Sequence, residues 1–393
     1  MTSLHTIEAM RQAAKRRLPR FAFDFIDGGA GRESALKVNA AAFDSVRLWP
    51  RVLSGTTDRT QAVDLLGHRY SAPFGVAPIG MANLISPGTD SALARAADVA
   101  GIVYVLSTAG TTALEEIAAE CHGAWFQLYI GQEASITDDL IDRAEAANLD
   151  VLVVTVDVPA PGKRIRDLNN GFTLPLRPSL RMAADLFCHP LWMLRIILGG
   201  APQFENLARY GRSGASATSV AELMARQSSA RLNWRLLESI RSRWQGRFVL
   251  KGVLCPDDAL RAARIGADAV IVSNHGGRQL DASPATLDAL RLVRKAVGTS
   301  VKLILDGGVR SGEDVARALA LGADFVLLGR PFLYAVAALG LECGPRQLIA
   351  QLTDEFDRAL AQLGCSNPSS LRSLINSRDM HCAERQSLRE SWY

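Results

Sequence analysis

Eight short runs of β-branched and other apolar residues recur along this chain, and they restrict its fold more than any other feature. Most are continuously apolar, which is typical of parallel strands covered on both faces. Helix-like stretches such as SALARAADVAG and PDDALRAARIGA separate them. Such repeats predict a (β/α)8 TIM barrel of the α/β class, whose chemistry lies at the carboxyl ends of the strands. The runs span residues 74–80, 102–108, 124–130, 151–159, 248–253, 269–276, 302–308 and 325–330.

The spacing of these runs also predicts how the rest of the chain is organised. We expect one barrel domain over residues 1–365, with a helical extension at residues 1–73 and a closing helix at residues 331–365. One long insert, residues 165–232, separates the fourth and fifth runs. It is too long for a plain loop, so it is either an active-site lid or a surface for a partner. The tail, residues 366–393, carries no chemistry that we identify.

The net charge of +4 is concentrated in this insert. Residues 173–231 hold seven arginines against Asp185, Glu205 and Glu222, a local balance of +4. The rest of the chain is therefore neutral in sum, and we expect no concentrated basic face and no nucleic-acid partner. The seven are Arg177, Arg181, Arg195, Arg209, Arg212, Arg226 and Arg231.

An apolar, tryptophan-bearing stretch, LFCHPLWMLRIILGG, lies within the insert at residues 186–200. It is too short to cross a bilayer, which takes about 20 residues of helix. One interpretation is a segment that lies in a membrane interface beside basic residues, with residues 177–215 as the docking region. The other is a lid helix packed on the barrel mouth. The sequence favours neither.

The cysteine pattern and the N-terminal sequence indicate the cellular compartment of the protein. The six cysteines form no CxxC pair and no metal-finger spacing, so we expect reduced thiols and no metal site. The first 20 residues have no apolar signal region, and no stretch reaches about 18 uninterrupted apolar residues. The chain is therefore expected in the cytoplasm, either free or peripheral on the inner face of the cell membrane.

The densest polar cluster follows the sixth run and reads SNHGGRQLD, residues 273–281. A histidine at the end of a strand, here His275, can remove a substrate proton near neutral pH. Arg278 can bind a carboxylate through two parallel hydrogen bonds. A lone histidine is more often structural, but this pair beside two glycines at a barrel mouth predicts a substrate site.

Glycines and arginines follow the seventh and eighth runs, where barrels of this kind bind phosphate. Glycines let backbone amides approach a phosphate, and arginines neutralise its charge. The pattern predicts a cofactor phosphate site, although turn glycines with surface arginines would look similar. These residues are Asp306, Gly307, Gly308, Arg310, Gly329 and Arg330.

Polar side chains on the earlier runs point into the same cavity. Spaced by two along neighbouring strands, they suit an extended polar ring system, although each alone could be a satisfied core residue. Lys251 is informative, because a lysine inside an apolar strand needs a negative partner or loses its proton. We expect an anion inside the barrel. The set is Ser107, Gln127, Tyr129, Thr155, Asp157 and Lys251.

Taken together, these motifs resemble the FMN-dependent 2-hydroxy acid dehydrogenase and oxidase family. The resemblance runs from about residue 7 to residue 365, and SNHGGRQLD is its most specific part. LPRFAFDFIDGGA, WFQLY, TVDVP, LKGV and LDGGVRSGEDVARALALGA add independent support. CHPLW and GAPQFENL in the insert are most similar to the branch that contains (S)-mandelate dehydrogenase and membrane-associated lactate dehydrogenases.

The resemblance implies roles for the substrate-binding residues. His275 would remove the hydroxyl proton, and Asp157 would pair with the resulting imidazolium. Arg164 and Arg278 would hold the carboxylate, and Tyr129 would hydrogen-bond the substrate. Transfer of the C2 hydrogen to flavin, as hydride or through a carbanion, stays open at this stage.

The same resemblance implies FMN as the cofactor. Lys251 would stabilise negative charge on the reduced flavin. The phosphate would bind Gly308, Arg310, Gly329 and Arg330, and Asp306 would contact the ribityl chain. The flavin ring would contact Pro78, Ile79, Gly80, Ser107, Gln127, Thr155, Lys251 and Ser273.

Two positions depart from the family pattern. Phe25 stands where the family usually has a tyrosine that donates to the substrate carboxylate, and Ile79 stands where a threonine near the flavin is common. A lost hydrogen bond to a charged group costs about 1.5 to 3 kcal/mol. Gly80, Ala109 and Gly110 leave space above the flavin, so we expect a large, aryl-type substrate side chain. The alternative is that these glycines only serve turns.

Several functions remain as alternatives. The leading one is oxidation of an (S)-2-hydroxy acid such as mandelate, with electrons passing to a membrane quinone. A soluble oxidase that releases hydrogen peroxide and a flavin-type L-lactate dehydrogenase are close variants. A non-redox phosphate-binding barrel is a second class, and a membrane-docked binding protein in which Phe25 marks lost catalysis is a third. The family resemblance further implies a homotetramer.

Overall fold

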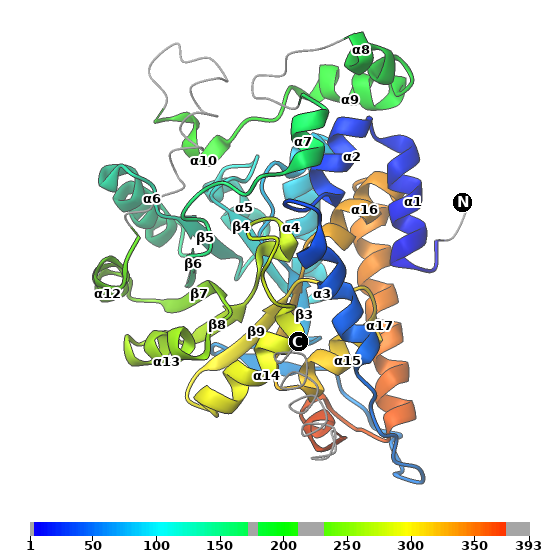
Figure 1. Ribbon diagram of the computed structural model, residues 1–393, viewed down its shortest axis with the longest axis vertical. Helices are drawn as coiled ribbons and strands as arrows, with labels where there is room; N and C mark the ends of the chain where they lie inside the picture. Colours follow the sequence, from blue (N-terminus) through cyan, green and yellow to red (C-terminus); the bar gives the residue numbers. More distant parts are fainter. Residues whose placement is uncertain (1–3, 172–179, 211–231, 375–393) are drawn as a thin grey trace, which may run out of the picture.

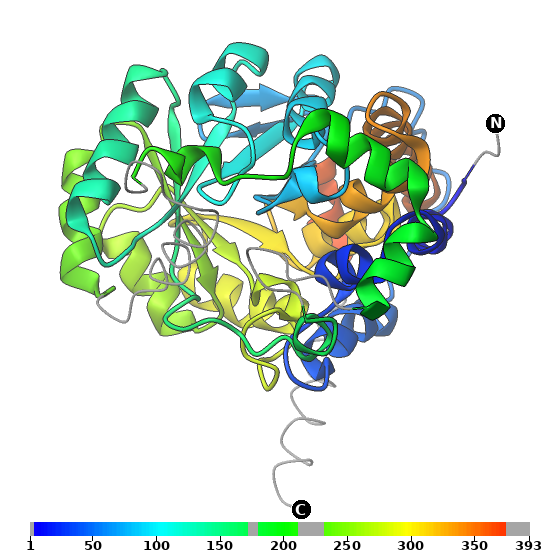
Figure 2. The ribbon, with the colours of Figure 1, turned by 90° about the horizontal axis from the view of Figure 1, so that it is seen from above.

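The computed structural model describes residues 4–171, 180–210 and 232–374, and it confirms the predicted barrel. Eight parallel strands close in the order β10, β3, β4, β5, β6, β7, β8, β9. Figure 2 looks into this ring from above. The strands are β3 (Phe74–Val76), β4 (Val103–Ser107), β5 (Trp125–Tyr129), β6 (Val151–Thr155), β7 (Arg247–Val253), β8 (Ala269–Val272), β9 (Lys302–Asp306) and β10 (Phe325–Leu328).

A helix follows each strand and covers the outside of the barrel. α13 shows why these stretches are helical: it opens with a proline and two aspartates and ends with basic residues, an order that suits the helix dipole. Its buried side is made of alanines. The outer helices are α4 (Thr89–Ala100), α5 (Leu114–Glu120), α6 (Ala134–Ala146), α12 (Trp234–Arg243), α13 (Pro256–Arg264), α14 (Thr286–Val297), α15 (Gly312–Ala320) and α16 (Arg330–Leu339).

A small hairpin closes the amino-terminal end of the barrel. β1 (Val63–Leu65) and β2 (His68–Tyr70) pair antiparallel, with both turn residues at positive φ. Tyr70 packs on Phe325 with ring centroids 5.7 Å apart and accepts a hydrogen bond from the Trp125 indole at 3.2 Å. The expectation of a wholly helical extension was therefore wrong here, because strands of three residues leave almost no periodic signal. This end of the barrel is apolar and filled.

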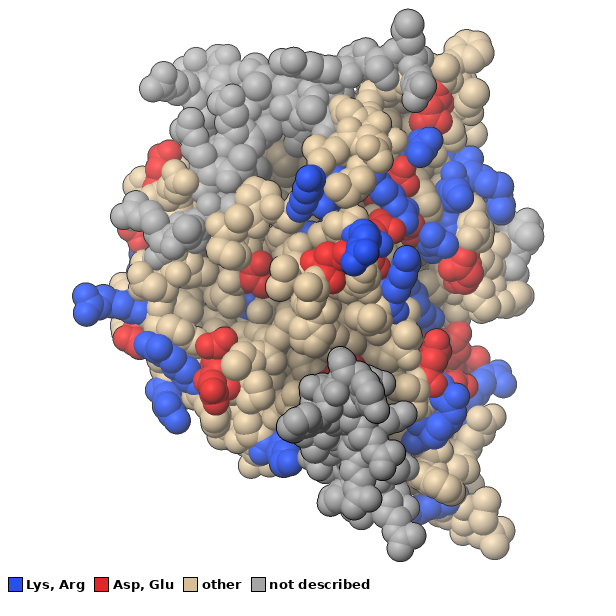
Figure 3. All heavy atoms as spheres, viewed as in Figure 1, with Lys and Arg blue, Asp and Glu red and all other residues tan. Residues whose placement is uncertain are grey.

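The rest of the extension is helical, with α1 (Ile7–Arg17), α2 (Arg20–Asp27) and α3 (Ser34–Ser45). Asp27 at the end of α2 is nearly buried and pairs with Arg11 at 2.5 Å and Arg166 at 2.8 Å, while the Tyr334 hydroxyl donates to it at 2.8 Å. Figure 3 accordingly shows basic and acidic side chains intermingled on the side of α1 to α3. The network fixes the extension against the barrel helices.

The insert lies across the carboxyl end of the barrel (Figure 1). Its described helices are α7 (Ile165–Asn169), α8 (Leu180–Phe187), α9 (Pro190–Gly199) and α10 (Glu205–Ala208). Trp192 on α9 is buried: its indole donates to the Leu84 carbonyl at 3.0 Å and packs edge-on against Phe21. α9 therefore packs on the barrel through one face. Its other face, with the end of α8, exposes Phe187, Leu191, Leu194, Ile197 and Leu198.

Only some of the arginines that give the insert its expected basic character lie within the described residues. Arg195 is exposed on α9, whereas Arg209 lies 3.5 Å from Glu115 and 3.7 Å from Asp139 of the barrel. That arginine is consequently compensated by acids outside the insert. Arg177, Arg212, Arg226 and Arg231, and the side chain of Arg181, lie outside the described residues.

The carboxyl-terminal region contains two helices where one closing helix was expected over residues 331–365. α16 ends at Gly340, whose φ of 88° breaks the helix, and α17 (Cys343–Leu363) follows. A short 3-10 helix, η3 (Pro368–Leu374), begins the tail. Among the described residues, no helix has the length and apolar character needed to span a membrane.

Candidate active site

A cavity of about 730 Å³ opens at the carboxyl ends of the barrel strands. Its wall is formed by the loops after β3, β6, β8, β9 and β10, by α2, and by the start of the insert. A cavity of this size accommodates a cofactor or a drug-sized ligand. Among the described residues, no cluster of three or more His, Cys, Asp and Glu is arranged to hold a metal ion.

The centre of the cavity brings together three of the predicted residues. His275 lies between two partners: its Nδ1 is 3.1 Å from Asp157 Oδ1 and its Nε2 is 3.3 Å from the Tyr129 hydroxyl. Burial alone would raise the pKa of Asp157, but His275 and Lys251 outweigh it and lower this pKa. Burial raises the pKa of Tyr129, which keeps its hydroxyl protonated. This arrangement leaves Nε2 directed to the cavity, where it can accept a proton.

Two arginines face the same space from opposite loops. The guanidinium carbon of Arg278 lies 5.1 Å and that of Arg164 5.5 Å from the ring centroid of Phe25. Burial lowers the pKa of Arg278 well below its usual range, and neighbouring Arg164 and Arg330 lower it further. Two close cations partly removed from water are relieved by an anionic ligand, so this part of the cavity suits a carboxylate.

Phe25 therefore supplies an aromatic face between the arginines and no hydroxyl. Its carbonyl accepts a hydrogen bond from Arg278 Nη1 at 2.6 Å, which orients that arginine. Asp167, on α7, lies 3.2 Å from Arg164 Nε and lines the cavity. Burial raises the pKa of Asp167. The carboxylate-binding region thus combines two arginines with one buried acid.

A row of buried polar groups lies beneath the cavity on successive strands. Ser107 donates to Gln127 Oε1 at 2.7 Å, and Lys251 Nζ donates to Ser273 at 2.8 Å and to Asp306. Within this row, Gln127 Nε2, Thr155 Oγ1 and Asp306 Oδ1 are buried and have no hydrogen-bond partner among the described residues. Unpaired buried polar atoms are costly. A donor and two oxygens along one floor fit a bound ring system with polar edges and a hydroxylated chain, as FMN has.

The predicted phosphate site consists of a glycine turn after β9 and the amino terminus of α16. Gly307 and Gly308 have φ of 92° and 87°, and a side chain at Gly308 would collide with the Asn39 carbonyl at 2.5 Å. Gly329 caps the amino terminus of α16 and, like Arg310, lines the cavity. This loop and helix terminus suit an anion.

Arg330 was expected to bind the phosphate, but most of its guanidinium group is used in hydrogen bonds within the protein. Its guanidinium donates to the carbonyls of Ile26, Gly276 and Gly28, each at 2.9 Å. It therefore joins the extension to the loop that carries His275. Two of its five N–H groups remain for a ligand.

Small residues leave open the side of the cavity next to β3. A Cβ added at Gly80 would lie 3.0 Å from the Ala109 Cβ, so these two positions pack directly against each other at the cavity wall. Pro78, Ile79 and Ala109 also line the cavity. Gly110 does not: a Cβ there would meet Leu106 and the Ser107 carbonyl at 2.8 Å, so Gly110 serves the turn.

Sequence reasoning missed part of the apolar wall. Met81, Val158, Leu168 and Phe204 line the cavity, the last two from the insert. Val158 and Phe204 stand within the TVDVP and GAPQFENL motifs, but nothing in those motifs shows that their side chains face the cavity; Met81 and Leu168 belong to no motif that we identify. Gly162, which follows the fourth predicted strand, lines the cavity and approaches the His275 loop closely, since a Cβ there would lie 2.1 Å from the Arg278 carbonyl oxygen.

Fold and site together define a cofactor-binding barrel oxidoreductase that acts on a small carboxylate. Comparison with known proteins makes this specific: the chain belongs to the FMN-dependent dehydrogenase family, which matches residues 14–377. It is 39% identical to (S)-mandelate dehydrogenase of Pseudomonas putida over 370 residues, 94% of this chain and 93% of that protein. It is 40% identical to L-lactate dehydrogenase of Stenotrophomonas maltophilia over 356 residues, 90% and 93% of the two chains.

Solved structures agree with this assignment. The crystal structure of the monotopic membrane protein (S)-mandelate dehydrogenase superposes with a TM-score of 0.90 at 38% identity, covering 94% of this chain and 98% of that one. Mandelate oxidase with (S)-2-phenylpropionate gives 0.80 at 36% identity, covering 95% and 98%. The protein is therefore an FMN-dependent 2-hydroxy acid dehydrogenase or oxidase.

Proposed function

We propose that this enzyme oxidises an (S)-2-hydroxy acid with a large, aryl-type side chain to the 2-oxo acid and passes the electrons to a membrane quinone. The observation that carries the substrate assignment is that two small residues, Gly80 and Ala109, line the cavity beside the His275 centre. Similarity to (S)-mandelate dehydrogenase and mandelate oxidase supports it.

The two arginines orient the substrate in this proposal. Arg164 and Arg278 bind its carboxylate, and the Tyr129 hydroxyl donates to an oxygen next to it. With the acid end fixed there, the C2 hydroxyl lies within reach of His275 Nε2. Such fixed geometry supplies much of the catalytic advantage of an enzyme site.

His275 then takes the hydroxyl proton on Nε2, and its Nδ1–H donates to Asp157. The carboxylate of Asp157 stabilises the imidazolium that forms, which is why its low pKa matters. Bound FMN would supply the acceptor for the C2 hydrogen and for the two electrons that leave the substrate with it. The products are the 2-oxo acid, a proton held at His275 and reduced cofactor.

The floor of the cavity holds the cofactor in the same proposal. Gln127 and Thr155 would hold the ring edge through their unpaired atoms, and Asp306 Oδ1 would accept a hydrogen bond from the ribityl chain. Lys251, hydrogen-bonded to Ser273 and Asp306, would lie beside the part of the flavin that gains negative charge on reduction and would stabilise that charge. The phosphate would be bound by Gly308, Arg310, Gly329 and Arg330. Ser107, Pro78 and Ile79 complete the pocket.

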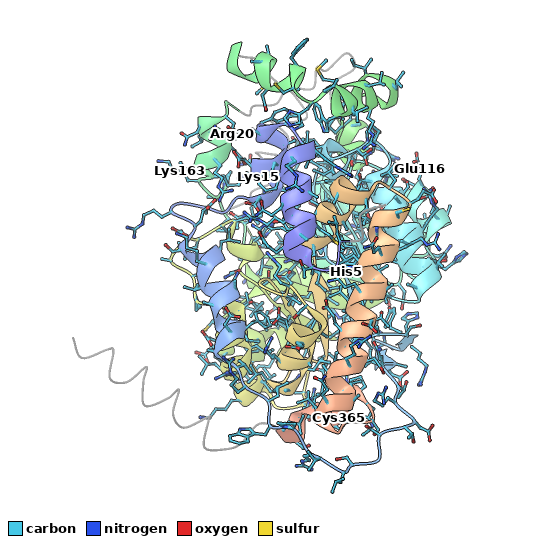
Figure 4. All side chains as sticks on the ribbon, turned by 90° about the vertical axis from the view of Figure 1, so that its right-hand side faces the viewer. His5, Lys15, Arg20, Glu116, Lys163 and Cys365 are labelled. Atoms are coloured by element: carbon cyan, nitrogen blue, oxygen red, sulfur yellow. The ribbon has the colours of Figure 1, made fainter. Side chains whose placement is uncertain are left out.

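The outer face of α8 and α9 supports a peripheral membrane location. Its five exposed apolar side chains form a patch that a soluble surface rarely carries without a partner. Arg195, exposed on α9, can meet anionic headgroups beside this patch, whereas Figure 4 shows Lys15 and Arg20 below these helices. A similar solved structure is that of a monotopic membrane protein. A quinone in the bilayer is then the nearest acceptor, and a homotetramer is the assembly that we propose.

Steady-state turnover separates the proposal from its alternatives. The enzyme is assayed with (S)-mandelate on anionic vesicles that contain a short-chain ubiquinone analogue, and in air without quinone. Turnover that depends on quinone supports the dehydrogenase, whereas stoichiometric hydrogen peroxide in air identifies an oxidase. A preference for L-lactate over (S)-mandelate identifies the lactate dehydrogenase alternative.

A further inference from the structure

The loop that carries His275, residues 273–281, has an energetically unfavourable backbone conformation that neighbouring groups must stabilise. His275, Gly276 and Gly277 all lie in the left-handed region, with φ of 57°, 62° and 74°. This conformation is cheap for glycine but costs energy for a residue with a Cβ, and it persists only when its surroundings impose it. His275 cannot relax without moving its ring away from Asp157 and Tyr129.

Asn274 imposes this conformation from inside the loop. Its side-chain oxygen accepts from the Gly277 amide at 3.0 Å, and its side-chain nitrogen donates to the Pro284 carbonyl at 3.0 Å. It therefore connects the start of the turn that carries His275 to the end of this turn at Gly277 and to Pro284 further along the chain. The position of the Asn274 amide group sets the position of the histidine.

Asn39 on α3 completes this arrangement from outside the loop. Its Nδ2 donates to Asn274 Oδ1 at 2.8 Å, and its Oδ1 accepts from Asn274 Nδ2 at 2.9 Å and from the Thr286 amide at 3.1 Å. Both asparagines are almost fully buried, with exposed fractions of 1% and 4%. A reciprocal amide pair shielded from water fixes both side chains, because each alternative orientation leaves buried groups unpaired.

We propose that Asn39 is a positioning residue that holds His275 in its catalytic orientation through Asn274. The inference rests on the proposed function of His275 as the base. The amino-terminal extension would then contribute to catalysis, because its helix α3 carries Asn39, which positions the loop of His275.

Other contacts keep α3 in place without Asn39, so its effect can be isolated. Asp281 accepts from the amides of Arg32 at 2.8 Å and Ala35 at 3.1 Å, and the Ala30 amide donates to the Gly277 carbonyl at 2.8 Å. Removing the Asn39 side chain should therefore loosen the turn and leave the helix docked.

The test compares the holoenzyme with Asn39→Ala, Asn274→Ala and the double variant. Each is measured for kcat and KM with (S)-mandelate and for amide hydrogen exchange of the peptide that covers residues 273–281. We expect Asn39→Ala to lower kcat roughly 10- to 100-fold with KM within about threefold, as for a small displacement of a catalytic group. Exchange in the peptide should rise, and the double variant should be no slower than Asn274→Ala alone.

Two further variants control for stability. Leu140→Ala removes a fully buried side chain from α6 and should lower the melting temperature while leaving kcat unchanged. If Asn39→Ala does not fold, Asn39→Asp replaces it, since this change keeps the two accepted bonds and turns the bond donated to Asn274 Oδ1 into a repulsive contact between two oxygens.

Additive losses in the double variant, or unchanged exchange in residues 273–281, would overturn the proposal. Failure of the proposed function is recognised separately. In that case the unaltered enzyme turns over no hydroxy acid, whereas the exchange measurements still report whether Asn39 holds the loop.

Discussion

The ring of Phe25 lies 5.1 Å from the guanidinium carbon of Arg278 and 5.5 Å from that of Arg164, at the position where the family resemblance led us to expect a tyrosine. The contact keeps the arginine stacked but supplies no hydroxyl donor. Phe25→Tyr should restore one charge-assisted hydrogen bond. We expect kcat/KM for simple 2-hydroxy acids to rise about tenfold, the low end of the gain for such a bond.

Steady-state kinetics with glycolate, L-lactate and (S)-mandelate measure this effect, with Phe25→Leu as the variant that removes the ring and adds no hydroxyl. A gain in Phe25→Tyr alone identifies the missing donor. Equal kinetics in the unaltered enzyme and Phe25→Tyr would mean that the two arginines already hold the carboxylate without it.

Substrate size is tested at Gly80. A Cβ there would stand 3.0 Å from the Ala109 Cβ and would fill the space assigned to the aryl group. We expect Gly80→Ala to lower kcat/KM for (S)-mandelate relative to L-lactate by roughly 10-fold or more, the usual cost of one misplaced carbon in a pocket. The matched variant Ala109→Gly enlarges the same space and should not cause that loss. An unchanged mandelate-to-lactate ratio in Gly80→Ala would show that the side chain lies elsewhere.

The stability of the extension depends on Asp27. Burial alone would raise its pKa, but hydrogen bonds from Arg11, Tyr334 and Arg166 hold the pKa well below the ordinary value. A depressed carboxyl pKa stabilises the fold above the unfolded pKa near 3.9 and loses this contribution as the pH falls below it. Asp27→Asn should therefore cost about 2 to 3 kcal/mol at pH 7, less than a fully buried pair because both arginines are one-third exposed.

Urea unfolding between pH 7 and pH 3 measures this dependence. The difference between the unaltered protein and Asp27→Asn should be constant from pH 7 to about pH 5 and shrink below about pH 4. Asp357→Asn, which removes the partner of Arg59 on the surface, is the control and should change little. A difference that grows toward acid pH would contradict the assigned ionisation of Asp27.

Membrane docking is tested on the outer face of α9. Leu191, Leu194 and Ile197 are 73%, 53% and 70% exposed, so replacing them with serine should leave the fold intact. We expect the triple variant to bind anionic vesicles at least about tenfold more weakly, because each apolar side chain contributes about 1.5 to 3 kcal/mol when buried. Leu292→Ser, at an equally exposed position on α14, is the control. Equal co-sedimentation of all three proteins would exclude this face as the docking surface.

Much of the barrel could be predicted because its signal is local. A parallel strand covered on both faces must be apolar throughout, so eight such runs predicted all eight strands. The β1–β2 hairpin and the break at Gly340 were missed, since three-residue strands and a single glycine change no periodicity. The polar residues of the site were accessible for the same local reason: they follow strand ends in recognisable motifs.

Residues that act through the tertiary path of the chain were not accessible. Phe204 lines the cavity only because the insert returns over the barrel, and Asn39 meets Asn274 across 235 positions of sequence. Arg330 was expected at the phosphate, but three carbonyls of the extension and the catalytic loop also use its guanidinium. These roles depend on contacts between segments that are distant in the sequence, and the residue pattern within one segment does not predict such contacts.

Anaerobic reduction of the bound flavin tests the central claim most directly, because it monitors cofactor, reaction and substrate in one measurement. The purified holoenzyme is mixed without oxygen with (S)-mandelate, (R)-mandelate or L-lactate, and the flavin absorbance is followed. We predict that (S)-mandelate bleaches the flavin completely and faster than L-lactate, and that (R)-mandelate does not. A flavin that stays oxidised with every 2-hydroxy acid would contradict the proposed oxidation at the His275 centre.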